Sequence, residues 1–349
     1  MSLFRIYLTV LSLVAPFQLN AETLNLLNWE AYLSEEIQHQ WEQQSGNRIE
    51  IIYFDNDEKR DAILLNSKHN SIDIAVVDEV IAERFGKEGK LIKLTEENVP
   101  NLKHMGEFWR YRCGNYAMPY LWGTLGIVYR SDIVATPPTS WNDLLNPSEQ
   151  LRGHIGMMDD YTDMLAPALF LHQHELNTED PKAFKQAFAS LKNQLPHVLT
   201  YDYVITFLQN SPNADELHMA LAYGGDQYTI NELQNSKGLW KYVIPAEGTV
   251  LWVDCLAITA SSEHQQEALN LINYLNKPAI AAKNAEDLYY ATPNDAATKL
   301  LSEEFRNDSE IFPEHKILRR SGLYEVLSNE NIRQRLRITN AIINIHESQ

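Results

Sequence analysis

Trp252 and Asp254 form the clearest pair of residues that could bind a charged ligand. They are two positions apart in an apolar run at residues 250–255, which has the pattern of a strand. Side chains alternate between the faces of a strand, so Trp252 and Asp254 point to one face and their neighbours to the other. A carboxylate accepts charge-assisted hydrogen bonds from an ammonium group, and an indole face attracts cations and packs against methylene groups. The pair therefore suits a cationic amine, although a surface aspartate beside a half-buried tryptophan has the same pattern.

A second group of acids, Asp159, Asp160 and Asp163, lies between a predicted strand and a predicted helix. Ligands of open α/β sheets bind at the carboxyl ends of strands, so these acids are candidates for a site. Asp160 and Asp163 also have the spacing of a capping box, with Asp in place of the usual Glu or Gln. Acids favour helix N-termini in any case, so the structural interpretation stays open beside the functional one.

Other predicted strand ends carry the same residue types. Trp29 and Tyr32 follow the first strand, Asp78 follows the third, and Tyr223 precedes Asp226 after a later one. Each residue alone could be structural. Their repetition at several strand ends favours a site lined by acids and aromatic rings.

Competing chemistry has little support in the sequence. The HExxH, GxSxG, GxGxxG and P-loop patterns are absent, and His172 and His174 do not face each other at helical spacing. The net charge of −18 repels nucleic acid. The two cysteines, Cys113 and Cys255, are too few for a metal centre; they either pair or remain as two buried thiols. We therefore expect a binding protein with no cofactor and no metal site, and not an enzyme.

Strands and helices alternate along the chain in the manner of an α/β protein. The sequence contains no glycine- or serine-rich linker, so two lobes would be joined by continuous strands that act as a hinge. Strands are predicted at residues 23–28, 48–53, 72–77, 116–129, 155–158, 220–223, 240–244 and 250–259, and helices at 34–44, 58–66, 164–176 and 263–275.

The first 21 residues have the layout of a secretory signal peptide. Arg5 precedes an apolar stretch, and the run at residues 19–21 resembles a small-residue cleavage site. An uncleaved membrane anchor is the alternative, but the apolar stretch is short for a span. We expect the mature protein to be exported.

The mature chain resembles the periplasmic spermidine/putrescine-binding proteins along nearly its whole length. Single pieces recur in other solute-binding families, whereas the ordered set is specific. The pieces are Leu-Asn-Trp at 27–29, Lys-Glu-Gly-Lys at 87–90, Met-Pro-Tyr-Leu-Trp-Gly at 118–123, Thr-Ser-Trp-Asn-Asp-Leu at 139–144, Trp-Val-Asp-Cys-Leu-Ala-Ile at 252–258 and Thr-Pro-Asn at 292–294.

The resemblance implies a location in the periplasm and a type II solute-binding fold, with two α/β lobes joined by crossing strands and a ligand cleft between them. The expected first lobe comprises residues 22–128 plus about 252–290, and the second about 129–251 plus 291–349. It also implies that Trp29, Tyr32, Asp78, Asp160, Asp163, Tyr223, Trp252 and Asp254 bind the ligand. In that view Asp254 holds an amine, and Trp29 and Trp252 sandwich the methylene groups.

Several positions depart from the family pattern. Asp78 stands where Ser is common, Val80 where an aromatic residue is usual, Tyr223 where Trp is typical and Asp163 where Glu is usual. Glu325 lies near a position where the family contributes Gln. We expect one extra carboxylate at the Asp78 end, so norspermidine is as good a candidate ligand as spermidine.

The resemblance implies two possible roles for a polyamine-binding protein. We favour a sensor that reports the polyamine to an inner-membrane cyclic-di-GMP enzyme; the alternative is the substrate-binding subunit of an ABC transporter that delivers it to a permease. A more distant alternative is a periplasmic protein that binds a metal or an amino acid. In each case we expect a monomer.

Overall fold

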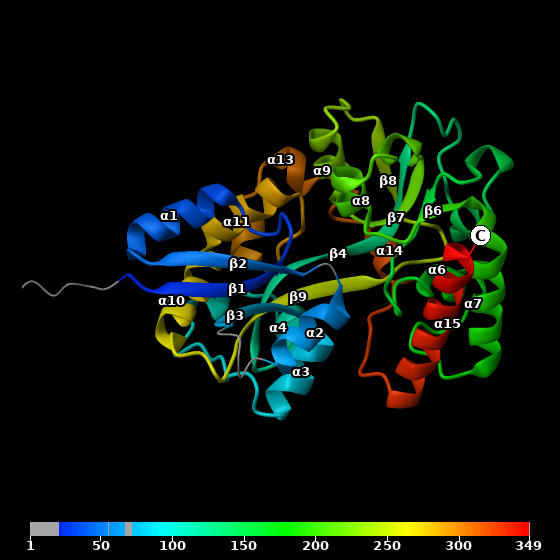
Figure 1. The fold of residues 1–349 in the computed structure, drawn as a ribbon. Coiled ribbons are helices and arrows are strands. Elements are labelled where there is room, and N and C mark those ends of the chain that lie inside the picture. Colours follow the sequence, from blue (N-terminus) through cyan, green and yellow to red (C-terminus); the bar gives the residue numbers. More distant parts are fainter. Residues whose placement is uncertain (1–20, 55, 67–71, 349) are drawn as a thin grey trace, which may run out of the picture.

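The computed structural model describes residues 21–54, 56–66 and 72–348. These residues form two α/β lobes connected by two long strands (Figure 1). The predicted signal peptide lies outside the described residues except for Ala21. None of the helices in the described ranges combines the length and the apolar character that crossing a membrane requires.

The first lobe is built on a mixed sheet in the order β2-β1-β3-β9-β4. β1 pairs in parallel with β2 and β3, whereas β9 runs antiparallel to both β3 and β4. Helices α1 and α11 cover one side of this sheet and α2, α3 and α4 the other (Figure 1). The elements of this lobe are β1 (Thr23–Trp29), α1 (Glu35–Ser45), β2 (Arg48–Phe54), α2 (Asp57–Leu65), β3 (Ile74–Asp78), α3 (Glu79–Lys87), α4 (Glu107–Cys113), β4 (Ala117–Arg130), β9 (Leu251–Ile258), α10 (Gln265–Leu275), α11 (Pro278–Leu288), α12 (Asp295–Thr298) and α13 (Glu303–Arg306).

The second lobe continues from the far half of β4, which pairs with β7 on one side and β8 on the other. Strand β5 joins β7 and β6 in parallel. Helices α7 and α15 pack against each other at the outer side of the lobe (Figure 1). The elements are α5 (Trp141–Leu145), β5 (Ile155–Gly156), α6 (Ala166–Leu171), α7 (Pro181–Gln194), β6 (Val198–Thr200), α8 (Val204–Asn210), β7 (Met219–Tyr223), α9 (Asp226–Leu233), β8 (Trp240–Val243), α14 (His315–Leu318) and α15 (Asn329–Glu347).

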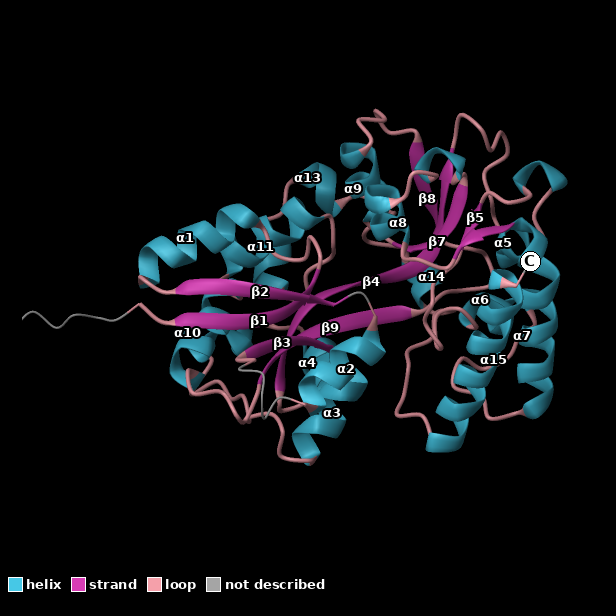
Figure 2. Ribbon diagram, viewed as in Figure 1, coloured by secondary structure: helices cyan, strands magenta, loops and turns pink. Residues whose placement is uncertain are grey.

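Strand β4 carries the chain from one sheet into the other (Figure 2). Its residues up to Thr124 pair with β9, and those from Leu125 pair with β7. The crossing therefore falls a few residues before the expected lobe boundary at 128/129. All of the strand except Arg130 is buried, as expected for the strand that links two cores.

Most predicted elements are confirmed, with differences at the ends of some. The predicted helix at 164–176 is shorter, since α6 ends at Leu171, and the strand predicted at 155–158 ends at Gly156. We expected residues 291–311 in the second lobe. Ala297, Phe305 and Ile311 of this segment pack in the hydrophobic cluster of the first lobe.

Cys113 and Cys255 form a disulfide, which resolves the alternative that the sequence left open. Both cysteines are fully buried. The bond ties the last residue of α4 to the residue that follows Asp254 in β9. It therefore holds a helix behind the strand that carries Trp252 and Asp254.

Candidate functional site

The two acids of the second lobe lie in the turn between β5 and α6. The Asp160 carboxylate accepts hydrogen bonds from the backbone N–H groups of Thr162 (2.8 Å) and Asp163 (2.7 Å), which fixes the turn. The Asp163 carboxylate instead accepts from the hydroxyls of Tyr223 and Tyr324, both at 2.7 Å. Half of the capping box is therefore present, in the bond from the Asp163 N–H to Asp160, whereas the Asp163 carboxylate is bound to tyrosines and α6 begins only at Ala166.

Asp163 is buried among neutral donors. Burial is the largest cause that raises the pKa of its carboxyl to about 7, and the nearby Asp160 adds to the rise. The hydroxyls of Tyr223 and Tyr324 and the more distant Arg335 oppose it. A cation that binds here would contact a carboxylate whose hydrogen-bond donors are uncharged hydroxyl groups.

Aromatic rings lead from Asp163 towards the first lobe. Tyr223 at the end of β7 contacts Trp252 edge-on, with ring centroids 5.7 Å apart. Trp252 contacts Tyr290 at 5.7 Å, and Tyr290 contacts Tyr32 at 5.2 Å, both edge-to-face. Gly123 lies opposite Trp252 on β4, and a β-carbon there would come within 2.4 Å of the indole. The glycine therefore makes room for this ring.

Asp254 lies at the first-lobe end of this row of rings. Burial raises the pKa of Asp254 to about 7, while the Tyr32 hydroxyl and Arg60 lower it and Asp78 and Glu79 raise it. Asp78 is its direct partner across the antiparallel pair of β3 and β9, so the two carboxylates share one face of the sheet.

Asp78 has two roles that the sequence did not reveal. As the N-cap of α3, it accepts a hydrogen bond from the backbone N–H of Ile81 at 2.8 Å. Its other oxygen accepts from the Arg60 guanidinium at 2.6 Å. The carboxylate that we expected to be extra at this end therefore has its charge paired within the protein.

Trp29 lies at the end of β1 beside this charged group. Its ring centroid is 4.3 Å from that of Phe54, and the Arg60 guanidinium lies 5.9 Å from the Phe54 ring. The other predicted residues are connected by hydrogen bonds, ring contacts or strand pairing. Trp29 contacts Phe54, and Phe54 in turn lies beside Arg60, which pairs with Asp78.

Three neighbours of the predicted residues were missed. Tyr290 bridges Tyr32 and Trp252 and donates to Asp226 at 2.8 Å, Tyr324 donates to Asp163, and Arg60 pairs with Asp78. The Tyr-Tyr pair at 289–290, just before the Thr-Pro-Asn motif, was a signal for Tyr290. Nothing local indicated Tyr324 or the partner of Arg60, because both contacts join segments far apart in the sequence.

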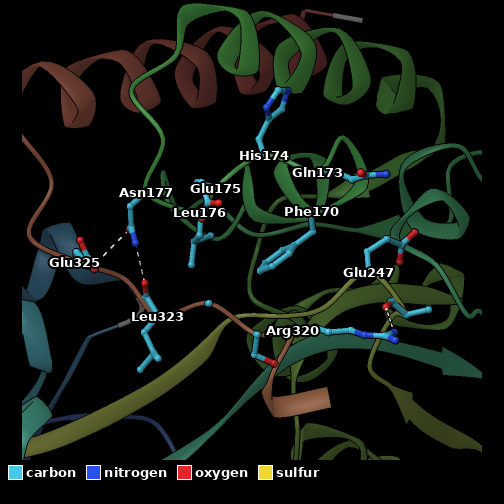
Figure 3. A pocket seen from close by; sticks show the side chains of 13 residues that line it. Phe170, Gln173, His174, Glu175, Leu176, Asn177, Glu247, Arg320, Leu323 and Glu325 are labelled. Atoms are coloured by element: carbon cyan, nitrogen blue, oxygen red, sulfur yellow. Dashed lines mark hydrogen bonds between the residues drawn. The ribbon is translucent and has the colours of Figure 1, made fainter. Parts of the chain in front are cut away.

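An open pocket lies elsewhere, in the second lobe. It has a volume of about 640 Å³ and contains none of the eight predicted residues (Figure 3). Glu325 lines it, and the Glu325 backbone N–H donates to Asn177 at 3.2 Å. Its walls also include Phe170, Glu247 and Arg320 (Figure 3). Within the described ranges no group of three or more His, Cys, Asp or Glu residues could hold a metal ion.

Comparison with known proteins agrees with this architecture. Two relatives are a norspermidine sensor from Vibrio cholerae and a spermidine/putrescine-binding periplasmic protein from Escherichia coli. The first is 33% identical over 95% of this chain and 92% of its own length, and the second is 28% identical over 85% of both chains. The relatives are binding or sensor proteins, in agreement with the expectation of a binding protein and not an enzyme.

Solved structures show the same fold. A Listeria monocytogenes protein assigned to spermidine/putrescine ABC transport aligns with a TM-score of 0.80 and 26% identity, covering 92% of this chain and 98% of its own. A spermidine/putrescine substrate-binding protein from Streptococcus pneumoniae aligns with a TM-score of 0.77 and 23% identity, covering 93% and 100%. The two lobes and their crossing strands are therefore those of the type II solute-binding fold. Residues 36–313 match the family profile as well, and the chain belongs to the bacterial extracellular solute-binding proteins.

Proposed function

We propose that this protein binds a polyamine of the spermidine or norspermidine class between its two lobes. The observation that carries the proposal is a row of side chains with an acid at each end and aromatic rings between them. Hydrogen bonds and ring contacts join Asp163, Tyr223, Trp252, Tyr290 and Tyr32. Asp254 lies two positions from Trp252 on the same face of β9.

A polyamine has the complementary pattern of ammonium groups joined by methylene chains. Asp163 and Asp254 would each hold an ammonium group by charge-assisted hydrogen bonds. The faces of Trp252 and Trp29 would pack against the methylene groups, and each cation–ring contact contributes about 0.5 to 2 kcal/mol. Asp163, which is buried, and Asp254, which is half-buried, favour a cationic ligand, because an ammonium group would supply a direct counter-charge to each.

The same row of residues disfavours the more distant alternatives. An amino acid would need a cation for its carboxylate, and the guanidinium of Arg60, at the first-lobe end, is already bound to three carboxylates. A metal would need clustered ligands, which the described residues do not provide. Ligand binding would close the two lobes, with Trp29, Asp78 and Trp252 on one side and Asp160, Asp163 and Tyr223 on the other.

We favour a sensing role, and the similarity to the Vibrio cholerae norspermidine sensor over nearly the whole chain supports it. In this role the liganded protein would be periplasmic, freed of residues 1–21, and would act on an inner-membrane cyclic-di-GMP enzyme. The alternative is delivery to an ABC transporter permease, which the similarity to the Escherichia coli protein supports. Deleting the gene should change the cyclic-di-GMP response to external polyamine in the first case and uptake of labelled polyamine in the second.

The binding proposal is tested by isothermal titration of the mature protein with putrescine, spermidine, norspermidine and spermine. We expect the tightest binding with one of the two triamines. If none of the four produces heat or a thermal shift, the polyamine proposal is wrong, and amino acids and metals become the ligands to test.

A further inference from the structure

Arg60 is a buried cation at the first-lobe end of the proposed site. It belongs to α2, and its side chain is only 1% exposed. The guanidinium donates to Asp57 at 2.8 Å, to Asp61 at 3.0 and 3.1 Å and to Asp78 at 2.6 Å. Such a fork of hydrogen bonds fixes the position of the charge.

Two guanidinium groups compensate part of the negative charge around Arg60. Asp61 also accepts from Arg84 at 2.9 Å, so three carboxylates share two guanidinium groups. In the second lobe, the hydrogen bonds to Asp160 and Asp163 come from backbone N–H groups and hydroxyls. The first-lobe end therefore offers far less uncompensated negative charge than its number of acids suggests.

The order of residues shows what a longer ligand would meet. From the second lobe, the row passes Trp252 and reaches Asp254 two positions later on the same face of β9. Asp78 lies opposite Asp254 on β3, and Arg60 is bound to Asp78. An ammonium group placed beyond Asp254 would therefore find the Asp78 carboxylate already bound by a fixed guanidinium, and would have to share it with that like charge.

We propose that Arg60 sets the length of the ligand by occupying the position that a further ammonium group would take, so that the site accepts triamines and rejects the tetraamine spermine. This inference rests on the proposed polyamine function. It assigns to Asp78 the role of holding Arg60 in place of binding the ligand directly.

The test compares spermine with norspermidine and spermidine in the wild-type protein and in Arg60→Gln. We expect wild type to bind the better triamine at least tenfold more tightly than spermine. In Arg60→Gln the spermine affinity should rise at least tenfold relative to the triamine, because an ammonium group can replace the lost guanidinium. The matched control is Arg110→Gln, which removes the same charge from an exposed pair with Glu96 and should keep the wild-type ratio.

Arg60→Gln leaves acids of the cluster without their counter-charge, so its folding is checked by thermal unfolding. The double variant Arg60→Gln/Asp78→Asn removes one charge of each sign and should lose most of the gain in spermine affinity. An unchanged ratio in Arg60→Gln overturns the inference while leaving the polyamine function intact. Wild-type binding of spermine as tight as that of the triamines also overturns it, whether or not any variant folds. Absence of binding with all polyamines overturns the proposed function and this inference together.

Discussion

In the first lobe, Asp78 shares the Arg60 guanidinium with Asp57 and Asp61, whereas in the second lobe Asp163 accepts hydrogen bonds from the hydroxyls of Tyr223 and Tyr324. Both arrangements satisfy an aspartate at the end of the same row of rings. Only the first neutralises its charge. The comparison teaches that the number of acids in a cleft does not give its charge, because the partner of each acid decides whether a ligand can use it.

Among the first-lobe acids, we expect replacement of Asp254 to weaken ligand binding most. Among the described residues no guanidinium is bonded to Asp254 as Arg60 is to Asp78, so Asp254→Ala should cost several kcal/mol of binding free energy through loss of the counter-charge to a desolvated ammonium group. Calorimetry with the better triamine measures the change. Asp132→Asn, which removes an acid paired with Arg130 at 2.8 Å, is the control and should bind normally. An Asp254→Ala affinity within tenfold of wild type would remove this acid from the site.

Asp163 and Asp226 allow a sharper comparison, because both are buried and both accept from two tyrosine hydroxyls. Asp226 also accepts from the backbone N–H of Tyr223 at 2.8 Å, and it is completely inaccessible, whereas Asp163 keeps 7% of its surface exposed. We expect Asp163→Asn to weaken triamine binding by about 2 kcal/mol, the value of a charged hydrogen bond, with little change in stability.

The companion variant, Asp226→Asn, should do the reverse. Its amide can accept fewer hydrogen bonds from Tyr203, Tyr290 and the Tyr223 backbone, so the free energy of unfolding should fall by about 1 to 3 kcal/mol. Denaturant unfolding and calorimetry on both variants separate the effects. Equal losses of affinity in the two would show that Asp163 has no special contact with the ligand.

The pH dependence should involve an acid from each lobe. The pKa values of Asp163 and Asp254 are raised to about 7, chiefly by burial, and a cationic ligand binds their charged forms. Affinity should therefore fall as the pH is lowered from 8 to 6, by roughly tenfold for each acid, and binding at pH 7 should release protons. Titrations in buffers of different ionisation enthalpy count those protons, and Asp163→Asn should remove about half of the dependence.

The stability of the unliganded protein should change in the opposite sense. Each of these acids has a folded-state pKa above its unfolded value of about 3.9, so the folded state holds more protons between these values. The stabilisation is complete below about pH 4 and is lost as the pH rises through about 7. Through these two groups, the melting temperature of the unliganded protein should decrease from pH 5.5 to 8. A saturating concentration of triamine should reverse the decrease.

The sequence predicted the fold and part of the site for identifiable physical reasons. Alternation in β9 placed Trp252 and Asp254 on one face, and the apolar strands were recognisable from their composition. The side-chain partners of Asp78 and Asp163 were not predictable in this way. Arg60 and Tyr324 reach them from 18 and 161 positions away, and such contacts depend on how elements pack and not on local pattern. Packing also decides which core a late segment joins, since buried residues between 297 and 311 pack in the first core.

Replacing either of two glycines of β4, which lie on either side of the crossing, should have the smallest effects predicted here on the two lobes. Gly123 faces Trp252 in the first sheet, whereas a β-carbon on Gly126 would meet Tyr242 and the carbonyl of Val243 at 2.5 Å in the second. We expect Gly123→Ala to displace the indole and weaken triamine binding several-fold, within the roughly 0.5 to 2 kcal/mol of a cation–ring contact. Gly126→Ala should lower stability instead, because backbone and a buried ring must move. Trp fluorescence during a triamine titration reports the first effect and thermal unfolding the second. If Gly123→Ala binds like wild type while its tryptophan fluorescence differs from that of wild type, the indole is a wall of the lobe and not a contact of the ligand.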